Sequence, residues 1–420
     1  MRLSKTLLNL LLIYTPLYCS ANAGSDLQLT WVNTAVGTCQ IVSCPVVDSN
    51  TPSPIIIVDC GTKGGRGKSF VQNRSLFGIN NNPEDNIRSV MAEYSADRDI
   101  TVVVSHGDGD HYNQIDTVIT GREDKVTKVY YGGILSNYGP KSKFLKLNIN
   151  GELIAKPGAV DQEIECGGAS ATIISAFKDR NKNKKNLNSI VLFLEYKGMR
   201  VLLTGDAWGQ TQEQANTWIN NNRTSSPFTI LVSSHHGAHG HGSNNRKWAD
   251  FIKPKIVIHP SGTGSADKFG HPFSRITQFY EPHVKKGFPE HWMSSCTNQP
   301  PGRYVGRVLT LSCSKYLTQD AQYSVAPYKS IKATIDVSGQ VYITLGEENS
   351  GDRASKVFGI AQRIRDSEDD LGIIFVQEKG IDELSIQNTK IVKKTLSKNR
   401  SRRRSKRLME RMKPKSNPSL

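Results

Sequence analysis

Residues 105–111, with the sequence SHGDGDH, place four potential metal ligands within six positions. They directly follow residues 100–104, an apolar, β-branched segment that is typical of a buried strand. Two glycines permit a tight turn in which the ligands can converge. Carboxylates and imidazoles packed this closely need a cation beside them, because burying unpaired charge is costly. The alternative is a polar surface turn, since Asp and Gly favour turns on their own account. The four ligands are His106, Asp108, Asp110 and His111.

Two later apolar segments also end in potential ligands. Residues 201–203 lead into Asp206, and residues 231–232 lead into the adjacent pair His235 and His236. Taken alone, an aspartate such as Asp206 is more often a loop or cap residue than a metal ligand. The histidine pair alone is as consistent with a structural role as with a ligand role. Because all three clusters follow strand patterns, one sheet edge could gather them into a site. The sequence therefore predicts a metal centre assembled from three separate segments.

Strand patterns dominate the early chain and later alternate with helical ones, which favours a layered α/β architecture. Apolar residues at helical spacing occur at 83–98, 209–221, 243–252 and 272–281. Strand patterns cover residues 27–32, 55–58, 100–104, 125–131, 171–177, 189–196, 199–203, 228–232 and 255–258. Residues 305–345 are also β-like, with a turn at 336–339, and residues 347–392 are mixed and predicted to form a small appendage or linker.

The beginning of the chain is typical of a secretory signal peptide over residues 1–23. Arg2 and Lys5 precede an apolar stretch, and Ala21-Asn22-Ala23 has the small-x-small form of a cleavage site. We therefore expect an exported protein, periplasmic or secreted, with an uncleaved anchor as the alternative. No later stretch approaches the roughly 18 apolar residues of a membrane span, so none is expected after cleavage.

The net charge of +16 is concentrated at the other end of the chain. Residues 393–415 carry twelve Lys or Arg against one acid, Glu410, with few apolar side chains. We expect residues 393–420 to be a disordered basic tail, because such a segment cannot bury a core. The tail either holds nucleic acid electrostatically or serves only solubility.

Cysteine usage fits export. Six cysteines remain after the expected cleavage, an even number that is consistent with disulfides in an oxidising compartment. Cys296 and Cys313 flank a Pro-rich loop and are the favoured pair, whereas the others could pair in several ways. No Cys-x-x-Cys motif occurs, which argues against a thiolate zinc site. The six are Cys39, Cys44, Cys60, Cys166, Cys296 and Cys313.

Together these motifs resemble the metallo-β-lactamase fold superfamily, whose signature is His-x-His-x-Asp-His. Here Asp108 stands at the second His position, and this variant, with LLTGD at 202–206 and HHG at 235–237, resembles the hydrolase domain of the ComEC competence proteins. Further similarity lies in IIIVDCG at 55–61, NSIV at 188–191 and FGHP at 269–272. The resemblance covers about residues 26–346. It implies a four-layer αββα sandwich over residues 24–346, followed by the tail.

The resemblance also implies roles for individual side chains. His106 and Asp108 would hold a first metal, Asp110 and His111 a second, and Asp206 would bridge the two. One of His235 and His236 would complete the ligand set, with the other near the substrate. His271 would be a ligand or a hydrogen-bond donor to the transition state, and Asp110 would orient or deprotonate the attacking hydroxide.

One position departs from the family pattern. Many relatives have a further His ligand before the bridging Asp, and here Asn188 stands near that place, so the first site could be weaker. Two Zn²⁺ ions are favoured, although the carboxylates also suit Mn²⁺.

Phosphodiester or nucleic acid hydrolysis is the favoured activity, because two-metal sites suit phosphoryl chemistry. Several basic residues precede Asn188 and could meet phosphates, or could simply form a solvated loop. A cell-envelope phosphoesterase acting on a headgroup or phosphocholine is an alternative. A non-catalytic metal- or nucleic-acid-binding protein on the same fold is another. The basic residues are Lys178, Arg180, Lys182, Lys184 and Lys185.

Overall fold

The computed structural model describes residues 25–34, 37–48, 52–62, 82–140, 142–149, 152–222, 227–260, 271–288, 290–298, 311–325, 327–346, 358–362 and 373–379. The chain divides into two compact units, one holding Met1–Asp352 and Ala361–Val376 and the other holding Arg353–Ile360 and Gln377–Leu420. The predicted signal peptide and basic tail lie outside the described residues, and so does most of the predicted appendage. Only strands β20 (Phe358–Gln362) and β21 (Ile373–Lys379) are described in that last region, and the domain boundaries stay predictions.

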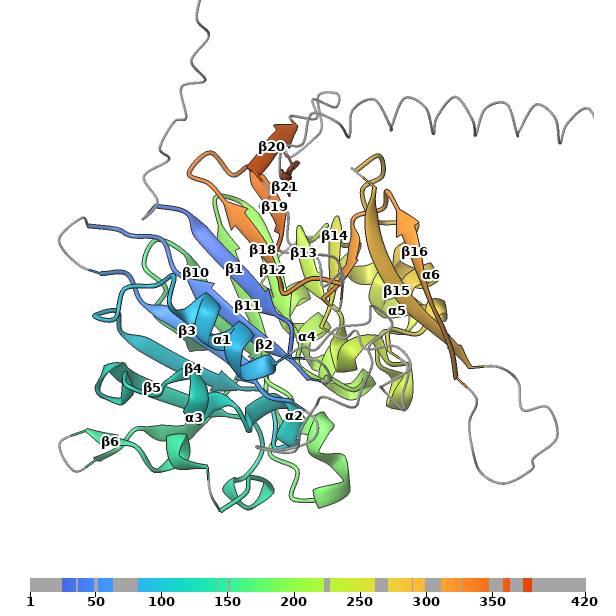
Figure 1. The fold of residues 1–420 in the computed structure, drawn as a ribbon. Helices are drawn as coiled ribbons and strands as arrows, with labels where there is room; N and C mark the ends of the chain where they lie inside the picture. Colours follow the sequence, from blue (N-terminus) through green and yellow to red (C-terminus); the bar gives the residue numbers. More distant parts are fainter. Residues whose placement is uncertain are drawn as a thin grey trace, which may run out of the picture. The chain divides into compact units, whose positions relative to one another are not determined.

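Two large mixed sheets form the body of the first unit (Figure 1). Within this unit the first sheet has the order β19-β18-β1-β2-β3-β4-β5-β8, with β3, β4, β5 and β8 mutually parallel. The second has the order β17-β14-β13-β12-β11-β10-β9, parallel from β12 to β17. The strands of the first are β1 (Leu27–Val32), β2 (Cys39–Ser43), β3 (Ile55–Cys60), β4 (Ile100–Val104), β5 (Val126–Tyr131), β8 (Ala155–Pro157), β18 (Ser330–Ile335) and β19 (Val341–Leu345). The strands of the second are β9 (Gln162–Glu163), β10 (Ser170–Ser175), β11 (Val191–Tyr196), β12 (Met199–Leu203), β13 (Ile230–Val232), β14 (Ile256–His259) and β17 (Gln322–Ser324).

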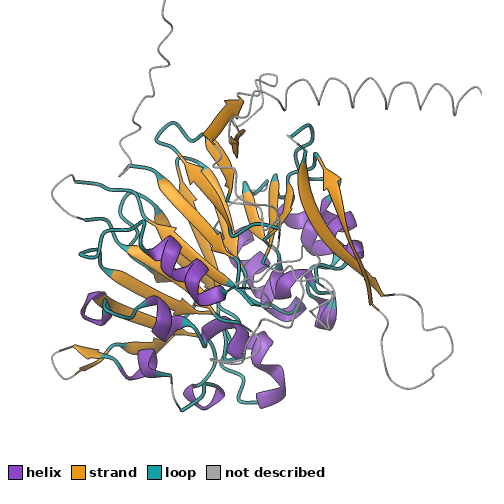
Figure 2. Cartoon of the chain, viewed as in Figure 1, coloured by secondary structure: helices purple, strands orange, loops and turns teal. Residues whose placement is uncertain are grey.

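Helices cover the outer face of each sheet (Figure 2). On the first sheet lie α1 (Pro83–Met91) and α3 (Ile115–Val118), and on the second lie α4 (Gly209–Asn221), α5 (Arg246–Ile252) and α6 (Ser274–Tyr280). The short helix α2 (Gly109–Tyr112) follows β4, and two small hairpins pair β6 (Asn148–Ile149) with β7 (Glu152–Leu153) and β15 (His291–Asn298) with β16 (Leu311–Thr318). No helix within these described ranges has the length and hydropathy of a membrane span.

Side-chain alternation along the strands produces the layers. In β3, Ile55 and Ile57 join the core under α1, whereas Ile56 and Val58 join the core between the two sheets. Successive strand residues point to opposite faces, so a strand that is apolar throughout must be covered on both sides. Every residue of β3 is buried. The chain therefore forms the four-layer αββα sandwich that the resemblance predicted.

The predicted elements agree with the structure except at some ends. Strands β1, β4 and β12 and helix α4 have the predicted bounds. Helix α1 ends at Met91 instead of continuing to residue 98, because Arg122 donates hydrogen bonds to the carbonyls of Met91 and Tyr94 and closes the turn. Tyr94 still packs into the core from that turn, which explains its helical spacing.

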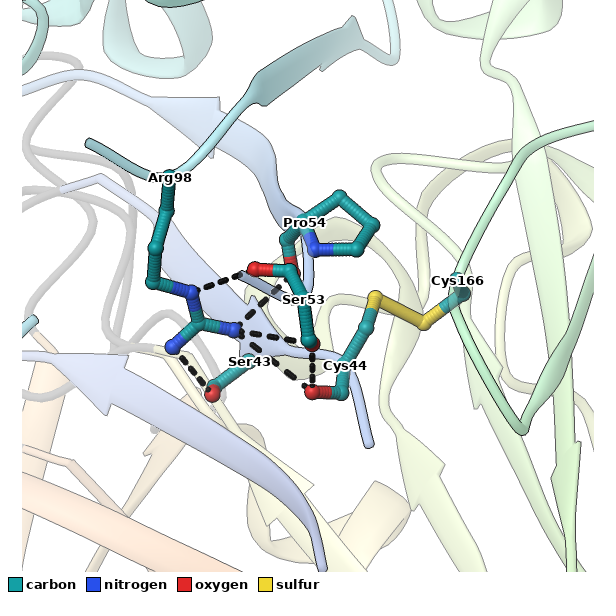
Figure 3. The surroundings of a disulfide bond; sticks show 6 residues. All are labelled: Ser43, Cys44, Ser53, Pro54, Arg98 and Cys166. Atoms are coloured by element: carbon teal, nitrogen blue, oxygen red, sulfur yellow. Dashed lines mark hydrogen bonds between the residues drawn. A yellow bond between two sulfur atoms is a disulfide. The ribbon is translucent and has the colours of Figure 1, made fainter. Parts of the chain in front are cut away.

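Two disulfides are present among the described residues. Cys39–Cys60 joins neighbouring strands β2 and β3, and Cys44–Cys166 joins the end of β2 to the loop between β9 and β10, linking the two sheets (Figure 3). The register of β15 and β16 places Cys296 opposite Cys313. Their side chains lie outside those described, so that disulfide stays a prediction.

Arg98 supports the backbone beside the disulfide between the sheets (Figure 3). Its guanidinium donates to the carbonyls of Ser53, Pro54 and Cys44 and to the hydroxyls of Ser43 and Ser53. The planar fork of Arg suits several acceptors at once, which a lysine could not match.

Replacing Arg98 by methionine should therefore destabilise the fold, because several of these acceptors would lose their donor. We expect Arg98→Met to lower the free energy of unfolding by about 2 kcal/mol, measured by chemical denaturation. The matched control is Arg88→Met, at an exposed arginine of α1, which should change it by less than about 0.5 kcal/mol. Equal effects of the two changes would contradict the role assigned to Arg98.

The stability of the fold should also depend on His259 at the end of β14. Burial lowers the pKa of His259 from 6.5 to about 4, although its contact with Gln322 opposes the shift. The folded protein thus keeps this imidazole neutral while the unfolded chain binds a proton. Stability should fall as pH drops from 6.5 to 4, by up to about 3 kcal/mol from this residue. Denaturation of His259→Gln should show a correspondingly flatter pH profile; an identical profile would contradict this account.

Candidate metal centre

The predicted ligands follow the carboxyl ends of strands in both sheets. His106 follows β4 of the first sheet, and α2 then carries Asp110 and His111. Asp206 follows β12, and His236 follows β13, both in the second sheet. The expectation of a single sheet edge was therefore wrong, because the site lies where strand ends of both sheets meet.

Asp206 stands at the middle of the centre, with each carboxylate oxygen facing imidazoles. Its Oδ1 lies 3.1 Å from His111 Nε2 and 3.6 Å from His236 Nε2, and its Oδ2 lies 3.8 Å from His106 Nε2. Asp110 Oδ2 lies 3.8 Å from His236 Nε2. Two overlapping groups of three result, His106–His111–Asp206 and Asp110–His111–His236, and all their members are buried.

Several of these donor atoms have no other use in the described part of the chain. Nε2 of His106, His111 and His236 and Oδ1 of Asp206 are buried and make no hydrogen bond of ordinary geometry with the residues that the structure describes. Two ligands on one tetrahedral ion, each about 2.1 Å from it, lie about 3.4 Å apart. The spacing of 3.1–3.8 Å between the donor atoms of these residues matches that value. The donor set therefore fits a divalent metal.

A second ring of contacts orients the imidazoles. Asp59 Oδ2 lies 2.8 Å from His111 Nδ1, and the same carboxylate accepts hydrogen bonds from the backbone N–H and hydroxyl of Ser105. The carbonyl oxygen of Pro260 lies 2.8 Å from His236 Nδ1. Because these oxygens can only accept, Nδ1 carries the proton and Nε2 offers its lone pair to the centre. Asp59 belonged to a motif of the resemblance, but the sequence assigned it no role.

The charges of Asp206 and His111 depend on each other. Burial raises the pKa of Asp206, but the neighbouring His111, His236 and His235 outweigh it and hold the pKa well below its ordinary value. Burial lowers the pKa of His111, but Asp206 and Asp59 outweigh it and raise the pKa well above 6.5.

Asp108 lies at the more exposed end of the centre. Its Oδ2 is 3.6 Å from His106 Nε2, and its Oδ1 is 3.1 Å from Lys185 Nζ, which also donates to the carbonyl of Gly107. Burial raises the pKa of Asp108, but His106 and Lys185 outweigh it and lower the pKa below its ordinary value. Asp108 is therefore ionised and shared between the centre and a lysine.

An asparagine does reach the centre, but it is not Asn188. Asn188 turns away and pairs with the backbone N–H and carbonyl of Asp179. Asn186 instead donates from Nδ2 to Asp206 Oδ2 at 3.0 Å, with His235 Nε2 at 3.4 Å. The sequence alone could not show which asparagine reaches the centre. Both lie in η5 (Lys182–Asn188), and the path of that segment determines where their side chains lie.

The two adjacent histidines are placed differently. His236 belongs to a ligand group, whereas His235 lies 3.7 Å from Asp206 Oδ2 with its side chain 24% exposed, and burial lowers its pKa. The His271 ring is buried, and its centroid lies 5.9 Å from that of His235 and 6.2 Å from that of His236. His235 and His271 thus flank the centre, and neither joins a described ligand group.

The turn that carries these histidines has unusual backbone angles. His235 and His236 have φ of 50° and 55°, in the left-handed region that costs a non-glycine residue roughly 1 kcal/mol or more. Buried Asn244 offsets this cost by bonding the N–H and carbonyl of Ser234 and the carbonyl of Ala238. Gly205, which precedes Asp206, has φ of 50°, and a Cβ there would lie 2.5 Å from the Ser105 side chain.

No family model and no curated protein matches the chain. Three solved structures are similar to parts of it. The metallo-β-lactamase fold protein YhfI from Bacillus subtilis is 12% identical, with a TM-score of 0.35, over 61% of this chain and 94% of its own. The short form of human tRNase Z is 11% identical, with a TM-score of 0.33, over 55% and 90%. A mutant of the CmlA β-hydroxylase is 13% identical, with a TM-score of 0.34, over 56% of this chain and only 46% of its own.

The contact between Asp59 and His111 generates a direct test. Asp59→Asn keeps the size of the side chain but removes the charge that holds the Nδ1 proton, so metal affinity should fall at least roughly tenfold. Competition with a chromophoric chelator measures this affinity. Asp124→Asn, at an exposed carboxylate, is the control and should not change it. Unchanged affinity in Asp59→Asn would contradict the orientation described here.

Proposed function

We propose that this chain is an exported metal-dependent hydrolase that cleaves phosphodiesters, with nucleic acid as the favoured substrate class. One observation carries the proposal: buried imidazole and carboxylate atoms converge around Asp206 without making hydrogen bonds to any described residue. Leaving such atoms unsatisfied is costly for a group of purely structural role. A bound cation would satisfy them together.

The ligand set supports a two-metal centre with unequal ends. Asp110, His111 and His236 would hold one ion, His106 and Asp108 the other, and Asp206 would face both. When bound, such ions acidify water and polarise phosphoryl oxygens. Zn²⁺ suits the imidazoles, and Mn²⁺ would suit the carboxylates.

The remaining residues would handle the substrate and its protons. Asp110 would orient the attacking water and accept its proton, and His271 would donate a hydrogen bond to the departing or developing oxygen. Lys185 already contacts the centre, and Lys178, Arg180 and Lys184 are exposed in the same segment. These cations would favour an anionic, phosphate-containing substrate.

Export fits the disulfides of the body. Cys39–Cys60 and Cys44–Cys166 would persist outside the reducing cytosol, in agreement with the predicted signal peptide. The combined motifs of residues 105–111, 202–206 and 235–237 support a ComEC-like hydrolase.

The test combines metal content with chelator-sensitive cleavage. We expect the purified protein to hold divalent metal and to cleave DNA or bis-p-nitrophenyl phosphate until a chelator is added. Asp110→Ala should reduce this rate by at least roughly a thousandfold while the fold persists, because a ligand and proton acceptor is lost. Asp124→Ala, at an exposed carboxylate, should retain the rate.

The outcomes separate the candidate functions. Cleavage of the small diester but not of DNA would favour a cell-envelope phosphoesterase that acts on a headgroup. Metal without any cleavage would favour a metal-binding protein on the same fold. Retained cleavage in Asp110→Ala would overturn the assigned chemistry, and neither metal nor cleavage would overturn the proposal as a whole.

A further inference from the structure

Two short segments contact the backbone of residues 110–114, which carries the candidate ligands Asp110 and His111. The segment at residues 37–39 contacts it through Thr38, whose N–H donates to the carbonyl of Asp110 at 3.2 Å. The segment at residues 59–61 contacts the turn after α2 through Cys60, whose carbonyl accepts from Gln114 N at 3.0 Å. The segments also bond each other, since Gly61 N donates to the carbonyl of Thr38 at 2.9 Å.

These segments approach the ligands too closely for any side chain to intervene. A Cβ on Gly61 would lie 2.3 Å from the carbonyl carbon of Asp110 and 2.5 Å from His111 N. A Cβ on Gly37 would lie 2.2 Å from the carbonyl oxygen of Gly61. Only glycine permits such contact, and close-packed backbone transmits small shifts. Any movement of residues 37–39 or 59–61 would therefore move Asp110 and His111.

The second segment also begins with the residue that orients His111. Asp59 has φ of 53° and is buried, with its carboxylate contacting His111 Nδ1 and Ser105. A left-handed aspartate at this place persists only while its surroundings hold it. Cys60 is the next residue, so the disulfide that it forms constrains the position of Asp59.

The Cys39–Cys60 disulfide cross-links these two segments. Cys39 and Cys60 are partners across β2 and β3, at the point where the register shifts before Gln40. Both cysteines are at most 1% exposed and lie beside the contacts to Asp110 and His111. At the opposite end of β2, Cys44 bonds Cys166 beside Arg98, away from these contacts (Figure 3).

We propose that Cys39–Cys60 is a positioning disulfide of the metal centre, which holds Asp59 and Gly61 against Asp110–His111 and makes metal affinity depend on the oxidation state of this pair. The proposal rests on the proposed metal-dependent function. On reduction, the disulfide would take two electrons and two protons from a dithiol reductant and give two thiols. The segments would then separate, and the protein would lose metal.

The second disulfide provides a matched control. Cys39–Cys60 closes 21 residues and Cys44–Cys166 closes 122. In the chain-entropy account the longer loop contributes more to stability. If disulfides affected the centre only through global stability, loss of Cys44–Cys166 would weaken metal binding more. The proposal predicts instead that loss of Cys39–Cys60 weakens metal binding more.

The experiment compares two double variants with the wild-type protein. Cys39→Ser with Cys60→Ser, and Cys44→Ser with Cys166→Ser, leave no unpaired thiol from the broken bond that could bind zinc. Chelator competition gives their dissociation constants for Zn²⁺ and Mn²⁺, and denaturation gives their stability. We expect the first variant to bind at least roughly tenfold more weakly and the second to stay within about twofold, although it is the less stable.

Wild-type affinity in the first double variant, or equal weakening in both, would overturn the proposal. If the first variant does not fold, the intact protein titrated with Mn²⁺ before and after dithiol reduction replaces it, because Mn²⁺ binds thiolates poorly. Unchanged Mn²⁺ affinity after verified reduction of Cys39–Cys60 would then overturn it. A wild-type protein that binds neither metal would overturn the proposed function as well, whereas tight binding in all variants overturns only this inference.

Discussion

The centre depends on one buried carboxylate, that of Asp206, placed between imidazoles that arrive from two different sheets. A buried anion without partners costs several kcal/mol, so Asp206 is stable only while those imidazoles face it. His106 and His111 come from the first sheet and His236 from the second. Pairing this carboxylate with imidazoles from both sheets therefore requires the strand ends of the two sheets to lie next to each other. The apolar core between the sheets supplies the favourable burial that holds them there.

Strained backbone is concentrated around that carboxylate. Asp59, His235 and His236 all have positive φ. Asp59 accepts hydrogen bonds from Ser105, the His235 N–H donates to the carbonyl of Gly205, and His236 Nδ1 contacts the carbonyl of Pro260. Conformations of this kind persist only where surrounding contacts determine them fully. The ligands are consequently positioned by the protein itself, by Asp59 and the carbonyl of Pro260, before any ion binds.

Local patterns in the sequence predicted much of this arrangement, and long-range contacts account for the rest. Residues 100–104 form a strand with the predicted bounds because they are β-branched throughout and buried on both faces. Residues 199–203 also have the predicted bounds, and all of them except Arg200 are buried. The ligand clusters were found because each is a short motif after such a strand. The role of Asp59 was missed because its partner His111 lies 52 residues away. The pairing of Cys44 with Cys166 spans 122 residues and two sheets, so no spacing rule could select it.

The segment η5 distinguishes the two ends of the centre. Asp110, His111 and His236 form a buried end. At the other end the path of η5 brings Asn186 to Asp206 and Lys185 to Asp108. There a lysine cation contacts Asp108 Oδ1, and an amide donates to Asp206 Oδ2. Because Lys185 lies on Oδ1 of Asp108 while Oδ2 faces His106, a metal ion at this end would share the carboxylate with the lysine. The carboxylate at the exposed end of the centre is therefore already paired with a lysine cation.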